Sequence, residues 1–104
     1  MAASGESQEI SLLKTQAAQG DARAQYNLGV CYYNGEGLIK DLKKAVEFFQ
    51  QAADQRDAEA QYSLGVCYGN GEGLSKDLKK AAELYQQAAN QGHVRAQCNL
   101  GVCY

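Results

Sequence analysis

Apolar residues recur along this chain at the spacing of an amphipathic helix. Ala24, Leu28 and Tyr32 follow one another at intervals of four, which places them on one face of a helix over about residues 21–34. A second apolar stripe lies in residues 41–55, and it consists of Leu42, Ala45, Phe48, Phe49 and Ala52. The pattern therefore predicts two consecutive helices, each of which buries one face.

The residues that flank these stripes are typical of helix ends. Asp21 and Asp41 stand where a side chain can accept hydrogen bonds from the backbone N–H groups of a first helical turn. Residues 34–38 read Asn-Gly-Glu-Gly-Leu, and glycines supply the positive φ angles that end a helix and turn the chain. We therefore expect an antiparallel helix pair joined by a tight loop, with Leu38 packed beneath the turn.

The whole helix pair is encoded twice. Residues 57–92 repeat residues 21–56 with 27 of 36 positions identical, and a fixed period of this length is typical of a stacked repeat array. Gly29 lies beside the apolar face of the first helix and recurs as Gly65 and Gly101. A glycine inside a helix costs about 1 kcal/mol relative to alanine. The recurrence therefore predicts that the second helix packs too closely for a side chain at this position.

The two ends of the array are expected to be irregular. Residues 1–20 predict a disordered start and an N-terminal capping helix, whereas residues 21–104 form the repeats, of which residues 93–104 are a partial third copy. This last helix ends at Tyr104 without its partner, and each repeat of such an array relies on its neighbour for burial. We interpret the C-terminus as a cut in a longer array, and self-association through the truncated C-terminal helix is one way to cover its apolar face.

The two full copies share a spaced pattern, Ala-x3-Leu-Gly-x2-Tyr-x2-Gly-x-Gly-Leu followed by Asp-x3-Ala-x3-aromatic-x2-Ala-Ala. In the first copy its members are Ala24, Leu28, Gly29, Tyr32, Gly35, Gly37, Leu38, Asp41, Ala45, Phe49, Ala52 and Ala53. The pattern resembles the Sel-1-like repeat family, which is related to the tetratricopeptide repeats. Tetratricopeptide repeats have a period of 34 residues, whereas the period of this chain is 36 residues. The resemblance implies an all-α fold, a right-handed α/α superhelix (solenoid) of antiparallel helix pairs. It also implies a non-enzymatic adaptor that assembles other proteins.

Charge and composition narrow the function further. The net charge of −2 argues against nucleic acid as a partner. No apolar run is long enough to span a membrane, and the N-terminus lacks the features of a signal peptide, so we expect a cytoplasmic protein without a membrane partner. No nucleophile, base and orienting group can be assembled from the sequence, so we expect neither enzymatic activity nor a cofactor.

The four cysteines and the one histidine are not spaced as a metal site or a disulfide framework. Cys31, Cys67 and Cys103 occupy the same position in successive copies, where equivalent helices are expected about 8–10 Å apart. A disulfide requires Cα atoms within about 7 Å, so we predict free thiols, which fit a reducing compartment. His93 stands where the earlier copies have aspartate and is expected to be an exposed residue at a helix start.

The predicted binding surface is the face of each first helix that lies opposite the core. In stacked helix pairs the first helices line the concave surface, and residues there could bind a peptide or a partner helix, with Tyr and Arg as anchors. The predicted partner-binding residues are Arg23, Tyr26, Asn27, Val30, Glu59, Tyr62, Ser63, Val66, Arg95 and Asn99. Two alternatives stay open: a designed or consensus-like repeat scaffold without a partner, and a secreted cysteine-rich repeat protein with penicillin-binding activity.

Overall fold

The computed structural model describes residues 8–99, and within this range the chain is entirely helical. Its helices are α1 (Gln8–Ala18), α2 (Ala22–Asn34), α3 (Leu42–Asp54), α4 (Ala58–Asn70), α5 (Leu78–Asn90) and α6 (Val94–Asn99). The helices expected from the apolar stripes are confirmed to within one or two residues, which is the usual uncertainty of a helix end. Expectations for the first seven residues and for residues 100–104 lie outside the described part of the chain.

The predicted helix ends are also confirmed. The side chains of Asp21 and Asp57 accept hydrogen bonds of 3.0 Å from the backbone N–H groups of Ala24 and Ala60. Asp41 and Asp77 cap α3 and α5 in the same way. The first helix of each pair ends at a glycine in the left-handed conformation, with φ values of 73° at Gly35 and 71° at Gly71.

Close approach of the helices explains the glycine inside each first helix. A Cβ atom added at Gly29 would lie 2.7 Å from two ring carbons of Phe49 on α3. At the equivalent Gly65, a Cβ atom would lie 2.7 Å from the ring of Tyr85 on α5. The aromatic ring of the second helix therefore rests directly on the backbone of the first, as the recurrence of this glycine predicts.

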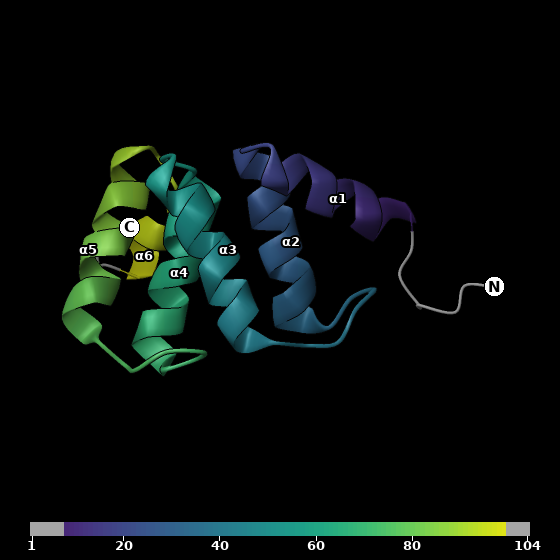
Figure 1. The fold of residues 1–104 in the computed structure, drawn as a ribbon. Helices are drawn as coiled ribbons and strands as arrows, with labels where there is room; N and C mark the ends of the chain where they lie inside the picture. The colour runs from purple at the N-terminus through teal and green to yellow at the C-terminus, as the bar shows by residue number, and fades with distance from the viewer. Residues whose placement is uncertain (1–7, 100–104) are drawn as a thin grey trace.

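The repeats stack along one direction, and the molecule measures 50 × 23 × 22 Å. Figure 1 shows the helices following one another from α1 at one end to α5 and α6 at the other. The larger core cluster joins the two full repeats, and its buried members are Ala45, Phe49, Ala52, Ala53, Ala60, Leu64, Cys67 and Leu84. Half of these side chains are alanines, which allows the helices to approach closely around the few larger residues.

Buried glutamines tie neighbouring repeats together, which the sequence analysis did not predict. Gln25 is 5% exposed, and its Nε2 donates to the carbonyl oxygen of Ala17 at 3.2 Å. Nε2 of Gln55 donates both to Oε1 of Gln25, at 2.8 Å, and to the carbonyl oxygen of Gly20, at 2.9 Å. The same arrangement recurs one repeat later among Gln91, Gln61 and Arg56. Each link between repeats is therefore held by side chains that satisfy its backbone carbonyl.

In the described part of the chain, no helix has both the length and the apolar character that crossing a lipid bilayer requires.

Candidate functional site

A groove of about 330 Å³ runs along the first helices of successive repeats. Its walls come from α2, α4 and α6, and one side chain of α3 forms its floor. The residues that line this first-helix groove are Tyr26, Val30, Tyr33, Asn34, Phe49, Tyr62, Ser63, Val66 and Arg95. Six of the ten predicted partner-binding residues are therefore brought together: Tyr26, Val30, Tyr62, Ser63, Val66 and Arg95.

Aromatic rings fix the shape of this groove. Phe49 is 2% exposed, and its ring centroid lies 5.8 Å from that of Tyr26 and 6.3 Å from that of Tyr33. Further along, Tyr62 packs on Tyr85 with the centroids 5.8 Å apart. These separations lie in the favourable range for aromatic pairs, so each tyrosine is supported from behind and keeps its orientation.

Tyr33 also lines the groove, although it is not among the predicted partner-binding residues. Its hydroxyl donates a 2.7 Å hydrogen bond to Oε1 of Glu72, in the loop of the next repeat. Burial, together with this bond to a carboxylate, raises the pKa of Tyr33 to about 12. The phenol is therefore neutral and bound at any physiological pH. A periodic signal was present, because Tyr33 follows Tyr26 by seven positions and Val30 by three, which is the same helical face.

Arg23 lies outside the groove lining and is already engaged by the next repeat. Its Nη1 lies 3.0 Å and 3.3 Å from the two carboxylate oxygens of Asp57. The guanidinium also lies over the ring of Tyr26, with Cζ 4.9 Å from the ring centroid. Asp57 is itself the cap of α4, so one carboxylate both caps its helix and receives the arginine of the preceding repeat.

The equivalent pair one repeat later has its carboxylate on the first helix rather than at the cap of the following repeat. Glu59, which replaces Arg23, lies 3.2 Å from Nε2 of His93, which replaces Asp57. The imidazole stacks on Tyr62 with centroids 4.8 Å apart, and its Nδ1 accepts a 3.2 Å hydrogen bond from the backbone N–H of Ala96. The prediction that His93 begins a helix is confirmed, but the prediction that it is exposed is wrong, since its side chain is only 9% exposed. The stack and the contact with Glu59 together cover the ring.

The two remaining predicted residues do not line the groove. Asn27 is exposed on α2, and the structure records no polar partner for it among the described residues. Asn99 instead hydrogen-bonds the hydroxyl of Tyr85, an interaction that works against the rise in the pKa of Tyr85 caused by burial. Both residues share a helix with groove residues, but neither contributes to the walls.

The cysteines agree only in part with the expectation of free thiols. Cys31 and Cys67 are free, and burial raises the pKa of both, to about 12 for Cys67. Cys98 is disulfide-bonded, so the expectation of free thiols throughout the chain is wrong at this position. Among residues 8–99, no three His, Cys, Asp or Glu side chains are grouped in a way that could hold a metal ion.

Comparison with known proteins agrees with the repeat pattern and its period. A family model described as Sel1 repeat matches residues 22–57, 58–93 and 94–104. The chain belongs to the Sel1 repeat family. Sel1 repeats generally serve as non-enzymatic modules of protein–protein interaction.

Similar Sel1 structures reproduce the fold over most of the chain. A protective antigen of uropathogenic Escherichia coli is 38% identical, with a TM-score of 0.87 over 88% of this chain and 20% of the antigen. A Sel1 repeat protein from Oxalobacter formigenes is 36% identical, with a TM-score of 0.86 over 90% of this chain and 39% of its own. Helicobacter pylori cysteine rich protein B is 26% identical, with a TM-score of 0.81 over 88% of this chain and 68% of its own.

A curated relative from Mus musculus, DAP3-binding cell death enhancer 1, is 38% identical over 48 residues. The match covers 46% of this chain but only 9% of the mouse protein. The chain therefore spans less than a tenth of the length of this relative.

Proposed function

We propose that this chain is a protein-binding adaptor module that holds a peptide or a partner helix in the first-helix groove. The observation that carries the proposal is the groove itself, a continuous space of about 330 Å³ along three successive first helices. Partly exposed aromatic rings held in place by their neighbours, such as Tyr26 and Tyr62, are typical anchors of protein interfaces.

The chemistry of the groove suits a polypeptide. Tyr26, Tyr62, Val30 and Val66 offer an apolar strip, and a bound segment can bury alternate or periodic side chains against it. Asn34, Ser63 and Arg95 supply hydrogen-bonding groups beside this strip. Such a combination of hydrogen-bonding groups and an apolar strip can fix both the orientation and the register of a bound segment.

The comparisons support a protein, rather than a small molecule, as the class of ligand. The mouse relative is named for binding DAP3, and it is 38% identical to this chain over 48 residues. The identity of a partner for this chain does not follow from that name, so the proposal is limited to a peptide or a helix that fits the groove.

The test uses a peptide library displayed on phage and selected on the purified chain. Peptides that survive selection are then measured against Val66→Glu, which places a charge in the groove, and against Ala82→Glu, which places the same charge on an exposed position of α5. We expect Val66→Glu to weaken binding at least about tenfold, because the charge must be desolvated, whereas Ala82→Glu leaves binding unchanged.

Selection of no peptide, or equal binding to both variants, would contradict the proposal and favour a repeat scaffold without a partner. Circular dichroism of both variants checks that helicity is retained, since Val66 is half-buried.

A cytoplasmic location is also proposed, and the free thiols of Cys31 and Cys67 support it. The disulfide at Cys98 instead favours an oxidising compartment and the secreted alternative. Alkylation of thiols in intact cells, before lysis, separates the two: four alkylated cysteines support the cytoplasm, and two protected cysteines contradict it.

A further inference from the structure

The first-helix groove has one charged side chain among its nine lining residues, that of Arg95 on α6. Arg95 is exposed, and among residues 8–99 the structure records no ion pair or hydrogen bond for its guanidinium. The groove therefore presents an unpaired positive charge to a ligand, although the whole chain has a net charge of −2. Such a charge favours ligands of opposite sign and repels those of like sign.

Glu59 does not pair with this guanidinium. It borders an open hollow of about 420 Å³ together with Arg95, but its carboxylate lies 3.2 Å from Nε2 of His93. The other side chains that line the hollow carry no carboxylate. A bound molecule is therefore able to supply the counter-charge of Arg95 without displacing an ion pair of the described chain.

An arginine at this position of the helix already holds a carboxylate elsewhere in the molecule. Arg23 stands two periods before Arg95, and its Nη1 lies 3.0 Å and 3.3 Å from the two carboxylate oxygens of Asp57. The planar guanidinium of arginine is well suited to a carboxylate, since both present their polar atoms in one plane. Arg23 lies outside the groove lining, whereas Arg95 is part of it, so only the carboxylate partner of Arg95 would come from a ligand in the groove.

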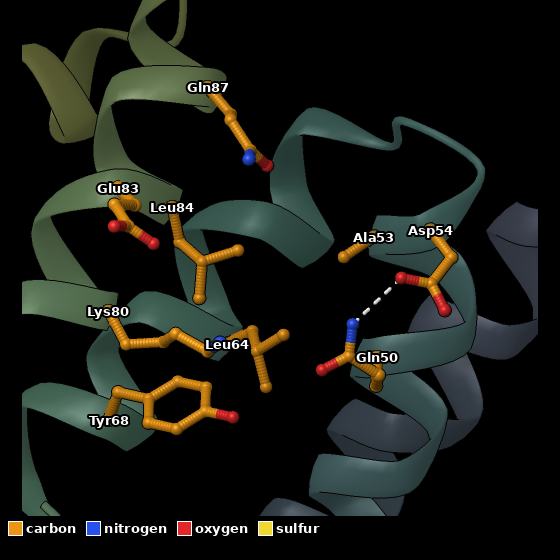
Figure 2. A pocket seen from close by; sticks show the side chains of 9 residues that line it. All are labelled: Gln50, Ala53, Asp54, Leu64, Tyr68, Lys80, Glu83, Leu84 and Gln87. Carbon is orange, nitrogen blue, oxygen red and sulfur yellow. Dashed lines mark hydrogen bonds between the residues drawn. The ribbon is translucent and has the colours of Figure 1, made fainter. Parts of the chain in front are cut away.

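The pocket of about 260 Å³ between α3, α4 and α5 differs from the groove in both apolar surface and charge (Figure 2). Its apolar floor is closed, because Leu64 and Ala53 are only 0% and 7% exposed. Figure 2 shows Lys80 and Glu83 on α5 opposite Asp54 on α3, so charges of both signs border this pocket. The first-helix groove, in contrast, combines partly exposed rings with a charge of one sign.

Resting on the function proposed above, we propose that the first-helix groove selects an acidic peptide segment, in which the side chain of an aspartate or glutamate pairs with Arg95. Apolar side chains of the same segment lie along the strip that includes Val30 and Val66. The acidic residue thus fixes which part of the segment lies beside α6.

The carboxylate comes from a side chain within the segment rather than from its C-terminus. Arg95 borders both the groove of about 330 Å³ and the hollow of about 420 Å³, so there is space on either side of it. A peptide can therefore pass Arg95 and continue, and it does not have to end there.

The first test replaces the acid in the ligand. Peptides selected by phage display on the purified chain are synthesised with each Asp changed to Asn and each Glu changed to Gln, one at a time. We expect one such change to weaken binding about three- to tenfold, because it removes the charge that faces Arg95. Selected peptides that lack an acidic residue, or that bind equally well after every replacement, would overturn the proposal.

A double-mutant cycle assigns the effect to Arg95. Arg95→Gln should weaken binding of the acidic peptide by the same factor, and it should cause no further loss once the peptide carries the neutral amide. Lys79→Gln is the matched control, since it removes the same charge from an exposed position of α5 outside the groove, and it should leave the affinity unchanged. Additive losses in the cycle, or equal losses in the two variants, would mean that net charge rather than contact with Arg95 attracts the acid, and the proposal would fail.

A C-terminal amide separates a side-chain carboxylate from a terminal one. We expect the amidated and free-acid forms of each peptide to bind equally well. Loss of affinity on amidation, with no loss when the acidic side chains are replaced, would overturn the proposal in favour of capture of a peptide C-terminus.

The same peptides distinguish failure of this inference from failure of the proposed function. If Val66→Glu weakens binding and Arg95→Gln does not, the peptide occupies the groove without using Arg95, so the proposed function stands and the acidic preference is wrong. If neither variant changes binding, or no peptide is selected, both are wrong.

Discussion

The repeat of residues 21–56 and the repeat of residues 57–92 have nearly the same backbone but fill it with different side chains. The cap residues Asp21 and Asp57 have φ, ψ values of −73°, 113° and −72°, 116°. The 27 identical positions include the caps, the loop glycines and the alanines of the core. The nine positions that differ therefore change what the repeats contact while the architecture stays the same.

Several of these differences compensate one another. In the first repeat, Tyr33 extends beside Phe49 and carries its hydroxyl to Glu72 of the next repeat. In the second repeat, Gly69 replaces Tyr33 and Tyr85 replaces Phe49, and a Cβ at Gly69 would lie 3.6 Å from the hydroxyl of Tyr85. The hydroxyl is thus carried by the second helix when the first helix loses its ring. The contact between Arg23 and Asp57 is likewise replaced, one repeat later, by the contact between Glu59 and His93.

The loop glycines are expected to give the largest difference between the repeats. A Cβ at Gly73 would lie 2.5 Å from the carbonyl oxygen of Leu42, whereas at the equivalent Gly37 it would meet no backbone atom but only the side chain of Ile10, at 2.9 Å. Both glycines have positive φ, which costs about 1–2 kcal/mol for an L-residue. We expect Gly73→Ala to lower the free energy of unfolding by about 3 kcal/mol or more and Gly37→Ala by about 1–2 kcal/mol, as measured by urea denaturation.

Gly20→Ala serves as the control for the backbone conformation alone. Its φ is 95°, and a Cβ there would meet nothing within 4 Å. Equal losses for Gly73→Ala and Gly20→Ala would show that the contact with Leu42 has no energetic weight.

Local features of this fold could be predicted from the sequence because each depends on residues close together in the chain. The caps at Asp21 and Asp41 and the left-handed glycine at Gly35 follow from rules that involve at most four residues. The tight packing at Gly29 needed only the repetition of a costly residue at a fixed period. The caps and the left-handed glycine are therefore visible in a single copy, whereas the packing at Gly29 becomes visible only when two copies are compared.

Contacts between repeats were harder to predict because their partners lie about 30–40 residues apart and depend on how the repeats stack. The burial of Gln25 and the stacking of His93 on Tyr62 belong to this class. A signal for the Arg23–Asp57 and Glu59–His93 contacts was nevertheless present, since the residues at both positions change together from one repeat to the next.

The Arg23–Asp57 and Glu59–His93 pairs are expected to give a smaller effect on the free energy of unfolding. Glu59→Arg and His93→Asp together give the second interface the residues of the first, whereas each change alone leaves two side chains that do not complement each other. We expect a double-mutant cycle at pH 7.5 to show a favourable coupling of about 0.5–1 kcal/mol. The coupling should fall as salt is added, because Arg23 in the first interface is 59% exposed.

The matched control for this cycle pairs His93→Asp with Arg23→Glu, since these two residues belong to different interfaces. Their effects should add without coupling. Coupling of the same size in both cycles would mean that net charge rather than contact between the paired side chains is responsible.

The smallest expected effect concerns the link between repeats. Arg56 has a φ of 69°, whereas the equivalent positions carry glycine, Gly20 at 95° and Gly92 at 87°. Arg56 follows the cap of α3 in the left-handed conformation that glycine adopts at no steric cost. We expect Arg56→Gly to raise the free energy of unfolding by about 0.5 kcal/mol, since relief of the strained backbone exceeds the extra entropy of glycine in the unfolded chain. The reciprocal Gly92→Ala should lower it by about 1 kcal/mol, because a Cβ there meets nothing within 4 Å and only the backbone conformation opposes it. If Arg56→Gly is destabilising instead, the arginine side chain stabilises the link in a way that outweighs its backbone strain.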